Sequence, residues 1–120
     1  MARQVPPPID FDPHEREIWS AAQRQLRLQG TWTRTDVPLL HFYTRSVRLA
    51  QRAREAAVDF PLQRTSTGTM IGHVEYQLAE KAEAAALRYA TALLLTPESR
   101  KRHGVTIPDS ATSELDALTA

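Results

Sequence analysis

Residues 74–95 read VEYQLAEKAEAAALRYATALLL, an alanine-rich run without glycine or proline. This composition favours one long helix. At ~100° per residue, its apolar side chains fall into two stripes on different sides of that helix. The first stripe consists of Val74, Leu78, Ala82, Ala85, Tyr89 and Ala92, and the second of Tyr76, Leu87 and Leu94. A helix that is apolar on two sides is buried on two sides, so we expect one stripe to pack within the chain and the other against a further partner.

A second long helix is predicted over residues 35–58, ending before Phe60-Pro61. Thr35 is the expected N-cap, and Asp36 complements the helix dipole. One face contains Leu39, Phe42, Ser46, Leu49, Ala50, Ala53 and Ala57, and the opposite face contains His41, Arg45, Arg48 and Arg52. The two long helices are predicted to form an antiparallel hairpin. Between them, Leu62 and Met70-Ile71 flank a turn-forming segment and could pair as a small β-hairpin.

Two shorter helices are predicted outside this hairpin. Asp12-Pro13-His14-Glu15 begins the first, with Asp12 as N-cap and Glu15 completing a capping box. This helix is expected to extend to about Gln29, before Gly30. Ile18, Trp19, Ala22 and Leu26 fall on one arc of it, and Arg16, Gln23, Arg24 and Arg27 on the opposite arc. Thr96-Pro97 begins the other, which extends through about His103 to Gly104.

These elements predict an all-α fold with one helical domain over residues 12–104. Residues 1–11 are expected to form an extended leader, because three consecutive prolines cannot start a helix. Residues 105–120 form a tail with three acidic residues and no base, which we expect to be flexible. Trp32, in the loop before the second long helix, is expected to be buried beneath the helix junction rather than exposed for base stacking.

Composition and motifs argue against several classes of function. The chain has 120 residues, 15 Lys and Arg against 14 Asp and Glu, and no cysteine, so disulfides and cysteine-based metal or thiol sites are excluded. Its apolar runs fall far short of the ~20 residues of a membrane span, and its start does not resemble a secretion signal; we expect a soluble protein of a reducing compartment. It contains no glycine-rich phosphate loop, metal-binding histidine pair or nucleophile elbow, so we predict no enzyme, metal or cofactor.

The most specific stretch is Leu93-Leu94-Leu95-Thr96-Pro97-Glu98-Ser99-Arg100-Lys101-Arg102. It follows, in order, Pro7-Pro8, Trp19, Leu26, Gly30, Thr35-Asp36, Leu40, Tyr43, Gly68 and His73. This order resembles the small terminase subunit of tailed double-stranded DNA bacteriophages over residues 6–104. One branch of that family ends its helical hairpin with Leu-Gly-Leu-Thr-Pro-x-Ser-Arg-x-Arg, which Thr96, Pro97, Ser99, Arg100 and Arg102 match.

Three positions depart from the family pattern. Leu94 stands where the family usually has glycine, which predicts a differently packed bend before Pro97. Val74 stands where a proline usually begins the third helix. The leader contains only Arg3, where relatives often have a longer basic tail, so this chain is less suited to contact DNA through such a tail.

The resemblance implies genome packaging in the host cell cytoplasm. Small subunits of this family recognise phage DNA and assemble into closed rings, here expected to have roughly nine subunits. They deliver or regulate the large subunit, which contains the ATPase and the nuclease, and have no catalytic activity themselves. The acidic tail is a hypothetical docking segment for the large subunit.

Two sets of residues are candidate sites, each with a purely structural alternative. The candidate DNA-binding residues are Arg16, Arg24, Arg27, Arg45, Arg48 and Arg52, which alternatively form a solvated surface. The candidate oligomer interface is Tyr76, Leu87 and Leu94, which alternatively belong to the core. Two other functions stay open: a dimeric helix-turn-helix DNA-binding regulator, because residues 12–58 contain two helices joined by a short turn, and a helical adaptor that binds only protein.

Overall fold

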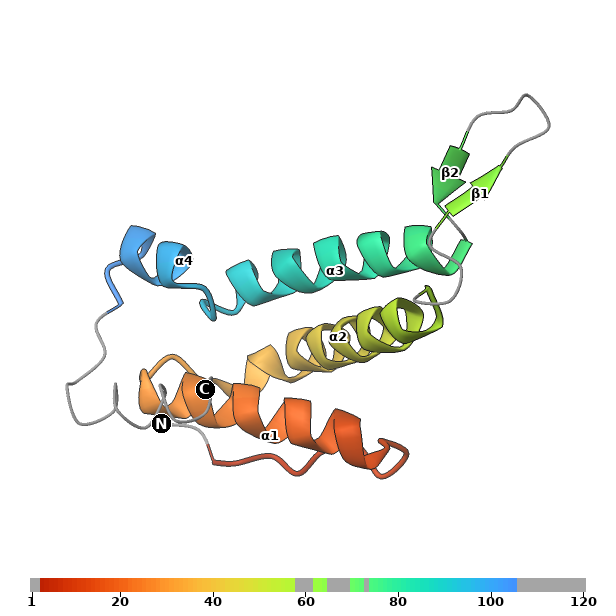
Figure 1. Cartoon of the computed structure of the whole chain (residues 1–120). Helices are drawn as coiled ribbons and strands as arrows, with labels where there is room; N and C mark the ends of the chain where they lie inside the picture. The colour runs from red at the N-terminus through yellow and green to blue at the C-terminus, as the bar shows by residue number, and fades with distance from the viewer. Residues whose placement is uncertain (1–2, 58–61, 65–69, 73, 106–120) are drawn as a thin grey trace.

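The structure is a computed structural model that describes residues 3–57, 62–64, 70–72 and 74–105 (Figure 1). In chain order its elements are α1 (Pro13–Leu28), the 3-10 helix η1 (Arg34–Asp36), α2 (Val37–Ala57), β1 (Leu62–Arg64), β2 (Met70–Gly72), α3 (Val74–Ala92) and α4 (Pro97–Arg102). Helices dominate the described chain, which confirms the predicted all-α class. The predicted tail, apart from Val105, lies outside the described residues.

The hairpin of α2 and α3 forms the most extensive packing interface between described elements (Figure 1). Its buried residues are small: Ala50, Ala53 and Ala57 of α2 and Ala79 and Ala82 of α3. Because the distance between two packed helices depends on the side chains at their contact, alanine lets these backbones approach closely. The alanine-rich composition of α3 therefore has a packing role as well as favouring a helix.

Aromatic contacts connect α2 and α3 near both ends of the hairpin. At one end, the ring centroids of Phe42 and Tyr89 lie 5.8 Å apart. At the other, the Arg54 guanidinium lies 4.8 Å from the centroid of the Tyr76 ring and forms an ion pair with Glu83. These contacts fix the two helices in register.

Two short strands follow the second of these ends. β1 and β2 pair antiparallel, with Leu62 opposite Gly72 and Arg64 opposite Met70. Residues 65–69 between them, where the sequence predicts the turn, lie outside the described residues.

The start of α1 confirms the predicted capping box. Asp12 Oδ1 accepts a hydrogen bond from the Glu15 backbone N–H at 2.7 Å, and Glu15 Oε1 accepts one from the Asp12 N–H at 3.1 Å. The helix ends at Leu28, with Gln29 as its C-cap. Its predicted apolar arc enters the main core cluster, which consists of Phe11, Trp19, Ala22, Leu26, Trp32, Leu40 and Leu93. This cluster joins α1 to the start of α2 and the end of α3, and it confirms that Trp32 is buried.

Gln23 corrects the prediction for the polar arc of α1. The sequence places it toward solvent, but only 1% of it is exposed. Its side-chain amide donates to the Val5 carbonyl at 2.9 Å and accepts from the Val5 N–H at 2.6 Å. Trp19 Nε1 donates to the same carbonyl at 3.0 Å, and Trp32 Nε1 donates to the Arg3 carbonyl at 3.1 Å. The prediction was wrong because the leader packs along α1 and covers Gln23.

The beginning of α2 also differs from the prediction. Thr33, not Thr35, precedes the first turn: its backbone N–H donates to Asp36 Oδ2 at 3.1 Å and its hydroxyl donates to the same oxygen at 3.0 Å. These bonds close η1, which continues directly into α2 at Val37. The sequence reading missed this because Thr33 and Thr35 are both acceptable caps, and the spacing to Asp36 selects Thr33.

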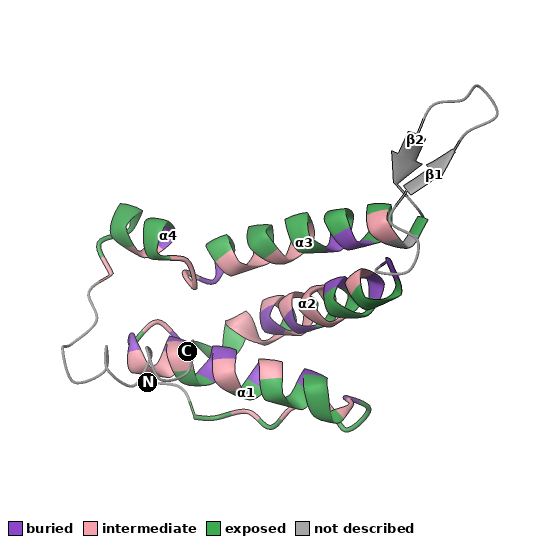
Figure 2. Cartoon of the chain, in the orientation of Figure 1, coloured by how far each residue is buried: buried purple, intermediate pink, exposed green. Residues whose placement is uncertain are grey.

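The buried face of α2 is shifted from the predicted one in its first half. Leu40 and Thr44 are buried, and the Thr44 hydroxyl donates to the Leu40 carbonyl at 2.9 Å. Phe42 and Leu49, predicted to be on the apolar face, are 53% and 43% exposed. The shift arises because the first half of α2 also packs against α1, which lies on a different side from α3 (Figure 2).

Three helices end in the same hydrogen-bonded turn, known as the Schellman motif. After α1, the N–H groups of Gly30 and Thr31 bond to the carbonyls of Arg27 and Leu26. After α3, those of Leu94 and Leu95 bond to Thr91 and Ala90, and after α4, those of Gly104 and Val105 bond to Lys101 and Arg100. The central residue has φ of +76° at Gly30, +68° at Gly104 and +64° at Leu94. The helix predicted to extend to Leu95 therefore ends at Ala92, and a leucine occupies a left-handed position that favours glycine.

Leu94→Gly is predicted to stabilise the protein. A leucine in the left-handed conformation destabilises the folded state by about 1–2 kcal/mol, and glycine removes this strain. Glycine also increases the conformational entropy of the unfolded chain, which offsets part of the gain. We therefore expect the free energy of unfolding to rise by about 1 kcal/mol. Denaturant unfolding would measure it, with Leu95→Gly as the matched control, which should destabilise because Leu95 packs against the core. A loss of stability in Leu94→Gly as large as in the control would contradict the left-handed turn.

Candidate functional site

The turn after α3 joins three helices through two backbone carbonyls. The Leu94 carbonyl accepts a hydrogen bond from Gln29 Nε2 at 2.9 Å. The Leu95 carbonyl accepts one from Gln25 Nε2 at 3.2 Å and another from Arg100 Nη1 at 3.0 Å. The left-handed conformation of Leu94 ends α3, so these carbonyls have no partner within that helix and accept hydrogen bonds from side chains at the end of α1 and in α4 instead. We call residues 93–100 the joint.

The family-like residues 96–99 build the start of α4 within this joint. Thr96 is the N-cap, and its hydroxyl accepts from the Ser99 N–H at 3.2 Å. Ser99 is buried and its hydroxyl donates to the Thr96 carbonyl at 2.9 Å. Pro97 occupies the first turn, where its missing N–H costs nothing. Thr96, Pro97, Ser99 and Arg100 thus have structural roles, whereas Arg102 is exposed and pairs only with Glu98, at 3.4 Å, among its described neighbours.

Gln25 and Gln29 donate hydrogen bonds to the joint, and the sequence did not reveal this role. Gln25 lies in the last turn of α1 and Gln29 is its C-cap, four residues later, so both side chains can reach one point on a neighbouring element. A pair of glutamines at the end of a helix is a weak signal by itself, and their partner carbonyls lie 65 and 70 residues away in the chain.

Two of the six candidate arginines form ion pairs with the beginning of α1. Arg45 Nη2 lies 2.9 Å from Asp10 Oδ2 and its Nη1 lies 3.2 Å from Glu15 Oε2. The Arg45 guanidinium also lies 4.9 Å from the centroid of the Phe11 ring. Arg48 Nε lies 3.4 Å from Asp12 Oδ2. These contacts attach α1 to α2 and partly neutralise this part of the predicted stripe.

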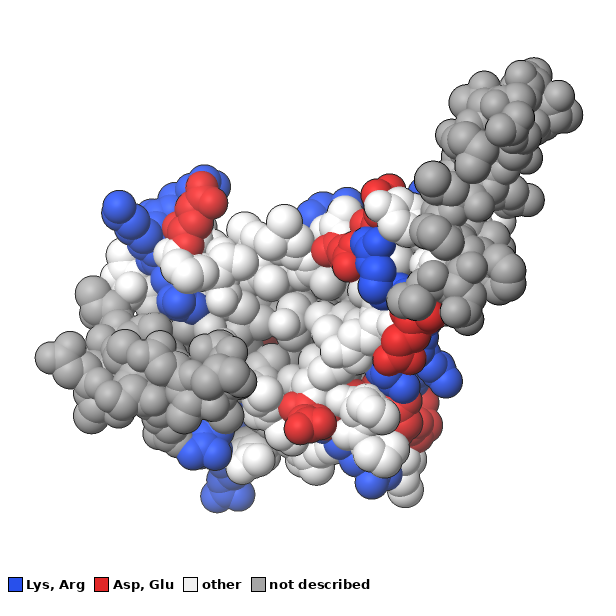
Figure 3. Space-filling view, in the orientation of Figure 1, with Lys and Arg blue, Asp and Glu red and all other residues white. Residues whose placement is uncertain are grey.

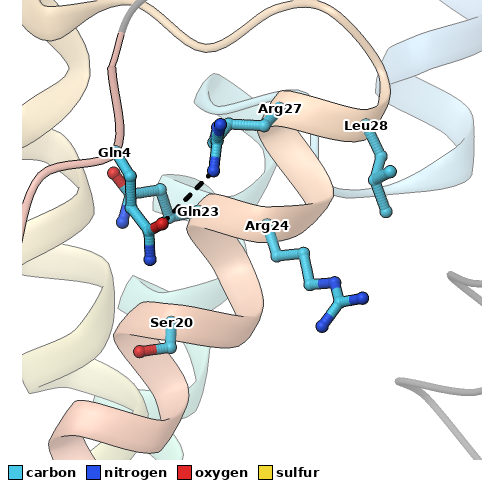
Figure 4. A pocket seen from close by; sticks show the side chains of 6 residues that line it. All are labelled: Gln4, Ser20, Gln23, Arg24, Arg27 and Leu28. Atoms are coloured by element: carbon cyan, nitrogen blue, oxygen red, sulfur yellow. Dashed lines mark hydrogen bonds between the residues drawn. The ribbon is translucent and has the colours of Figure 1, made fainter.

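The other four arginines are distributed over two helices. Arg16 donates to the Ile9 carbonyl at 3.4 Å, and Arg52 is exposed one turn beyond Arg48. Arg24 and Arg27 line a hollow of about 580 Å³ on the outer surface of α1 (Figure 4). The structure therefore divides the predicted set, and two of its members, Arg24 and Arg27, share a concave surface.

The predicted oligomer-interface residues have three different environments. Leu87 is 60% exposed, Tyr76 is half-buried beside Arg54, and Leu94 is half-buried in the joint. Tyr76 and Leu87 border one edge of the hairpin. Four other large apolar residues are also exposed: Phe42, Leu49, Val74 and Leu78. They lie along the opposite edge of the hairpin, as their helical spacing and the contact between Phe42 and Tyr89 indicate. The sequence pattern places these residues on apolar helix faces, but it does not reveal which parts of those faces the fold leaves exposed.

The described residues contain no group of three or more His, Asp or Glu side chains that could hold a metal ion. None of the described helices is long and apolar enough to cross a membrane.

A sequence model of the family described as "Phage terminase, small subunit" matches residues 16–110, which include most of α1 and all of α2, α3 and α4. This chain belongs to the phage terminase small subunit family. The match supports a role in phage DNA packaging. No curated protein and no solved structure matches the chain at a significant level. In this family member, the joint residues lie inside the matched region and the leader lies outside it.

The capping box predicts how this terminase small subunit responds to acid. The Glu15 backbone N–H holds the pKa of the Asp12 carboxyl below its ordinary value of 3.8; partial desolvation opposes this, and Arg48 adds to the lowering. Because the folded state binds the Asp12 proton less readily than the unfolded state, its stabilising effect is complete above pH 3.8 and is lost as the pH falls through the lower folded-state pKa.

Asp12→Asn should therefore weaken the acid dependence of stability, because asparagine caps a helix but does not titrate. Chemical unfolding at a series of pH values below 5 would measure the slope of the unfolding free energy. An identical slope in Asp12→Asn and the parent protein would show that Asp12 does not contribute in this way.

Proposed function

We propose that this chain is a terminase small subunit that binds viral DNA, assembles into a closed ring, and recruits or regulates the large subunit in the host cytoplasm. The family match over residues 16–110 is the observation on which the proposal rests. The large subunit would supply the ATPase and nuclease, so the small subunit needs no catalytic residues of its own. The ring would contain roughly nine copies of the chain, the number that the family resemblance implies.

The two edges of the hairpin support assembly into a ring. A ring requires a heterologous contact, in which two different surfaces of one chain meet, whereas a two-fold dimer needs only one self-complementary surface. The Phe42 edge contains Phe42, Leu49, Val74 and Leu78. The Leu87 edge contains Tyr76, Leu87 and an apolar groove lined by Val47, Ala50, Gln51, Arg54, Glu83 and Ala86. We propose that the Phe42 edge of one subunit packs on the Leu87 edge of the next.

The environment of α2 favours this proposal over a helix-turn-helix regulator. A recognition helix must present one face to the major groove of DNA. Here α2 packs against α3 and its first half also packs against α1, with His41 and Arg45 both beside the Phe11 ring. Two sides of the candidate recognition helix are thus covered by other helices of the fold.

Ring assembly would multiply weak DNA contacts. A single subunit has few exposed arginines on any one surface, but a ring repeats each of them in every copy. Simultaneous contacts of this kind can increase overall affinity by about 10²–10⁴. The acidic tail over residues 105–120 is the proposed segment for the large subunit, because it combines three acidic residues and no basic one with the apolar Leu115 and Leu118.

Phe42→Glu and Leu87→Glu are each predicted to dissociate the assembly, because a charge at either edge would be buried in the contact. Light scattering behind a sizing column should give a narrow mass of many 13.5 kDa subunits for the parent protein and a much smaller mass for both variants. Ala84→Glu is the control, since Ala84 is exposed on α3 away from both edges.

Either of two results would contradict the proposed assembly. A dimeric parent protein would favour the regulator. Parent-like masses for both edge variants would show that the hairpin edges are not the contact.

A further inference from the structure

The hollow on α1 combines hydrogen-bond donors with positive charge. It is lined by Gln4, Ser20, Gln23, Arg24, Arg27 and Leu28, and none of these described lining residues is acidic (Figure 4). Two guanidinium groups with a hydroxyl form the donor set that best fits phosphate oxygens. We propose that this hollow binds a phosphate group of the DNA backbone. The inference rests on the proposed DNA-binding function and assigns it to a specific site.

The leader forms one wall of the hollow and is held in place by the core. Gln4 lies between Arg3 and Val5, whose carbonyls accept hydrogen bonds from Trp32 and from Trp19 and Gln23. Because the donors are buried side chains, this part of the leader is fixed before any ligand arrives. A site that needs little ordering loses less free energy on binding.

Arg27 has unused capacity to donate hydrogen bonds. Its Nη1 donates to Gln4 Oε1 at 3.3 Å, a long contact to a neutral acceptor. Its Nε is buried and has no hydrogen-bond partner within the described part of the chain. A phosphate oxygen beside Gln4 would give this half-buried guanidinium a charged acceptor, and such bonds are shorter and stronger than neutral ones. Arg24, three residues earlier, also lines the hollow, and its side chain is directed away from the Arg27–Gln4 pair (Figure 4).

Neighbouring charges indicate the direction in which the DNA continues. A second hollow shares Ser20 and Arg24 with the first, but it is also lined by Glu17, which would repel phosphate. In the opposite direction, Gln25 of α1 and Arg100 of α4 donate to the same Leu95 carbonyl, so α4 lies beside the last turns of α1.

Basic side chains gather over α4 (Figure 3). Lys101 and Arg102 are both exposed there, and the one described acidic residue of the helix is Glu98. The DNA backbone is therefore expected to pass from the hollow toward α4. We call this region, residues 20–34 with residues 96–104, the basic end.

Binding of a fluorescent DNA duplex, measured by anisotropy between 0.1 M and 1 M salt, tests the proposal. A phosphate contact contributes a salt slope of about 0.9, which amounts to roughly eightfold in affinity across this tenfold range. Arg24→Ala and Arg27→Ala should each weaken binding at 0.1 M salt by at least this factor and should lower the slope by about one for each subunit that contacts the duplex. Arg88→Ala is the matched control, because Arg88 is an exposed arginine of α3 outside the candidate DNA-binding set, and its loss should leave both quantities unchanged.

Because Arg27 is half-buried, Arg27→Ala could weaken DNA binding by disturbing the fold, and Arg27→Lys separates this effect from the loss of a phosphate contact. It keeps the positive charge and loses the planar fork, so it should bind DNA more weakly than the parent protein while unfolding at the same temperature. Inorganic phosphate should compete with the duplex for the parent protein more strongly than chloride at equal ionic strength.

Failure of the site and failure of the proposed function give different results. A parent protein that does not bind the duplex would contradict the DNA-binding function itself. A parent protein that binds, together with Arg24→Ala and Arg27→Ala variants that keep its affinity and slope, would overturn the phosphate site alone. Equal losses in Arg24→Ala and Arg88→Ala would also overturn it, because they would indicate a general effect of charge.

Discussion

The carbonyls of Leu94 and Leu95 are the point on which the arrangement of the helices depends. The left-handed conformation of Leu94 ends α3 and leaves these two acceptors to Gln29, Gln25 and Arg100. Backbone carbonyls near a buried helix end must find partners, because an unpaired one costs free energy comparable to a lost hydrogen bond. Here the partners come from α1 and α4, so the same few bonds determine where both helices lie relative to the hairpin. Leu93, one residue earlier, enters the core with Leu26 and Trp19.

This joint also explains how structural roles and the proposed DNA-binding roles are distributed among the arginines. Arg45 and Arg48 lie near the start of α1, where Asp10, Asp12 and Glu15 pair with them. The end of α1 is held next to α4, and both elements contain exposed cations there. Exposed ion pairs contribute little to stability, about 0–1 kcal/mol, so the Arg102–Glu98 pair leaves Arg102 accessible to a stronger phosphate acceptor. Proximity in the fold, rather than position on one helical face, groups the arginines that we assign to DNA.

Local signals in the sequence were sufficient to predict much of this fold. Helix ends depend on residues only a few positions apart, so the sequence predicts them well. The structure confirms the capping box of Asp12 and Glu15 and the helix-ending glycines Gly30 and Gly104. The sequence could not reveal that Gln23 is buried, because its partner Val5 belongs to a leader whose path depends on the folded core. Nor could it reveal the partners of Arg45 and Arg48, which are acids 30 to 36 residues away. Arg24 and Arg27 were predicted as DNA contacts, but the hollow between them depends on Gln4 and emerges only when the leader packs on α1.

Backbone hydrogen exchange of the assembled protein, with and without duplex DNA, would locate the DNA-binding surface without altering any residue. A surface centred on the basic end predicts slower exchange over residues 20–34 and 96–104 in the complex, with little change over residues 45–52. Slower exchange confined to residues 45–52 would contradict the assignment and would return the DNA contact to the arginine stripe of α2.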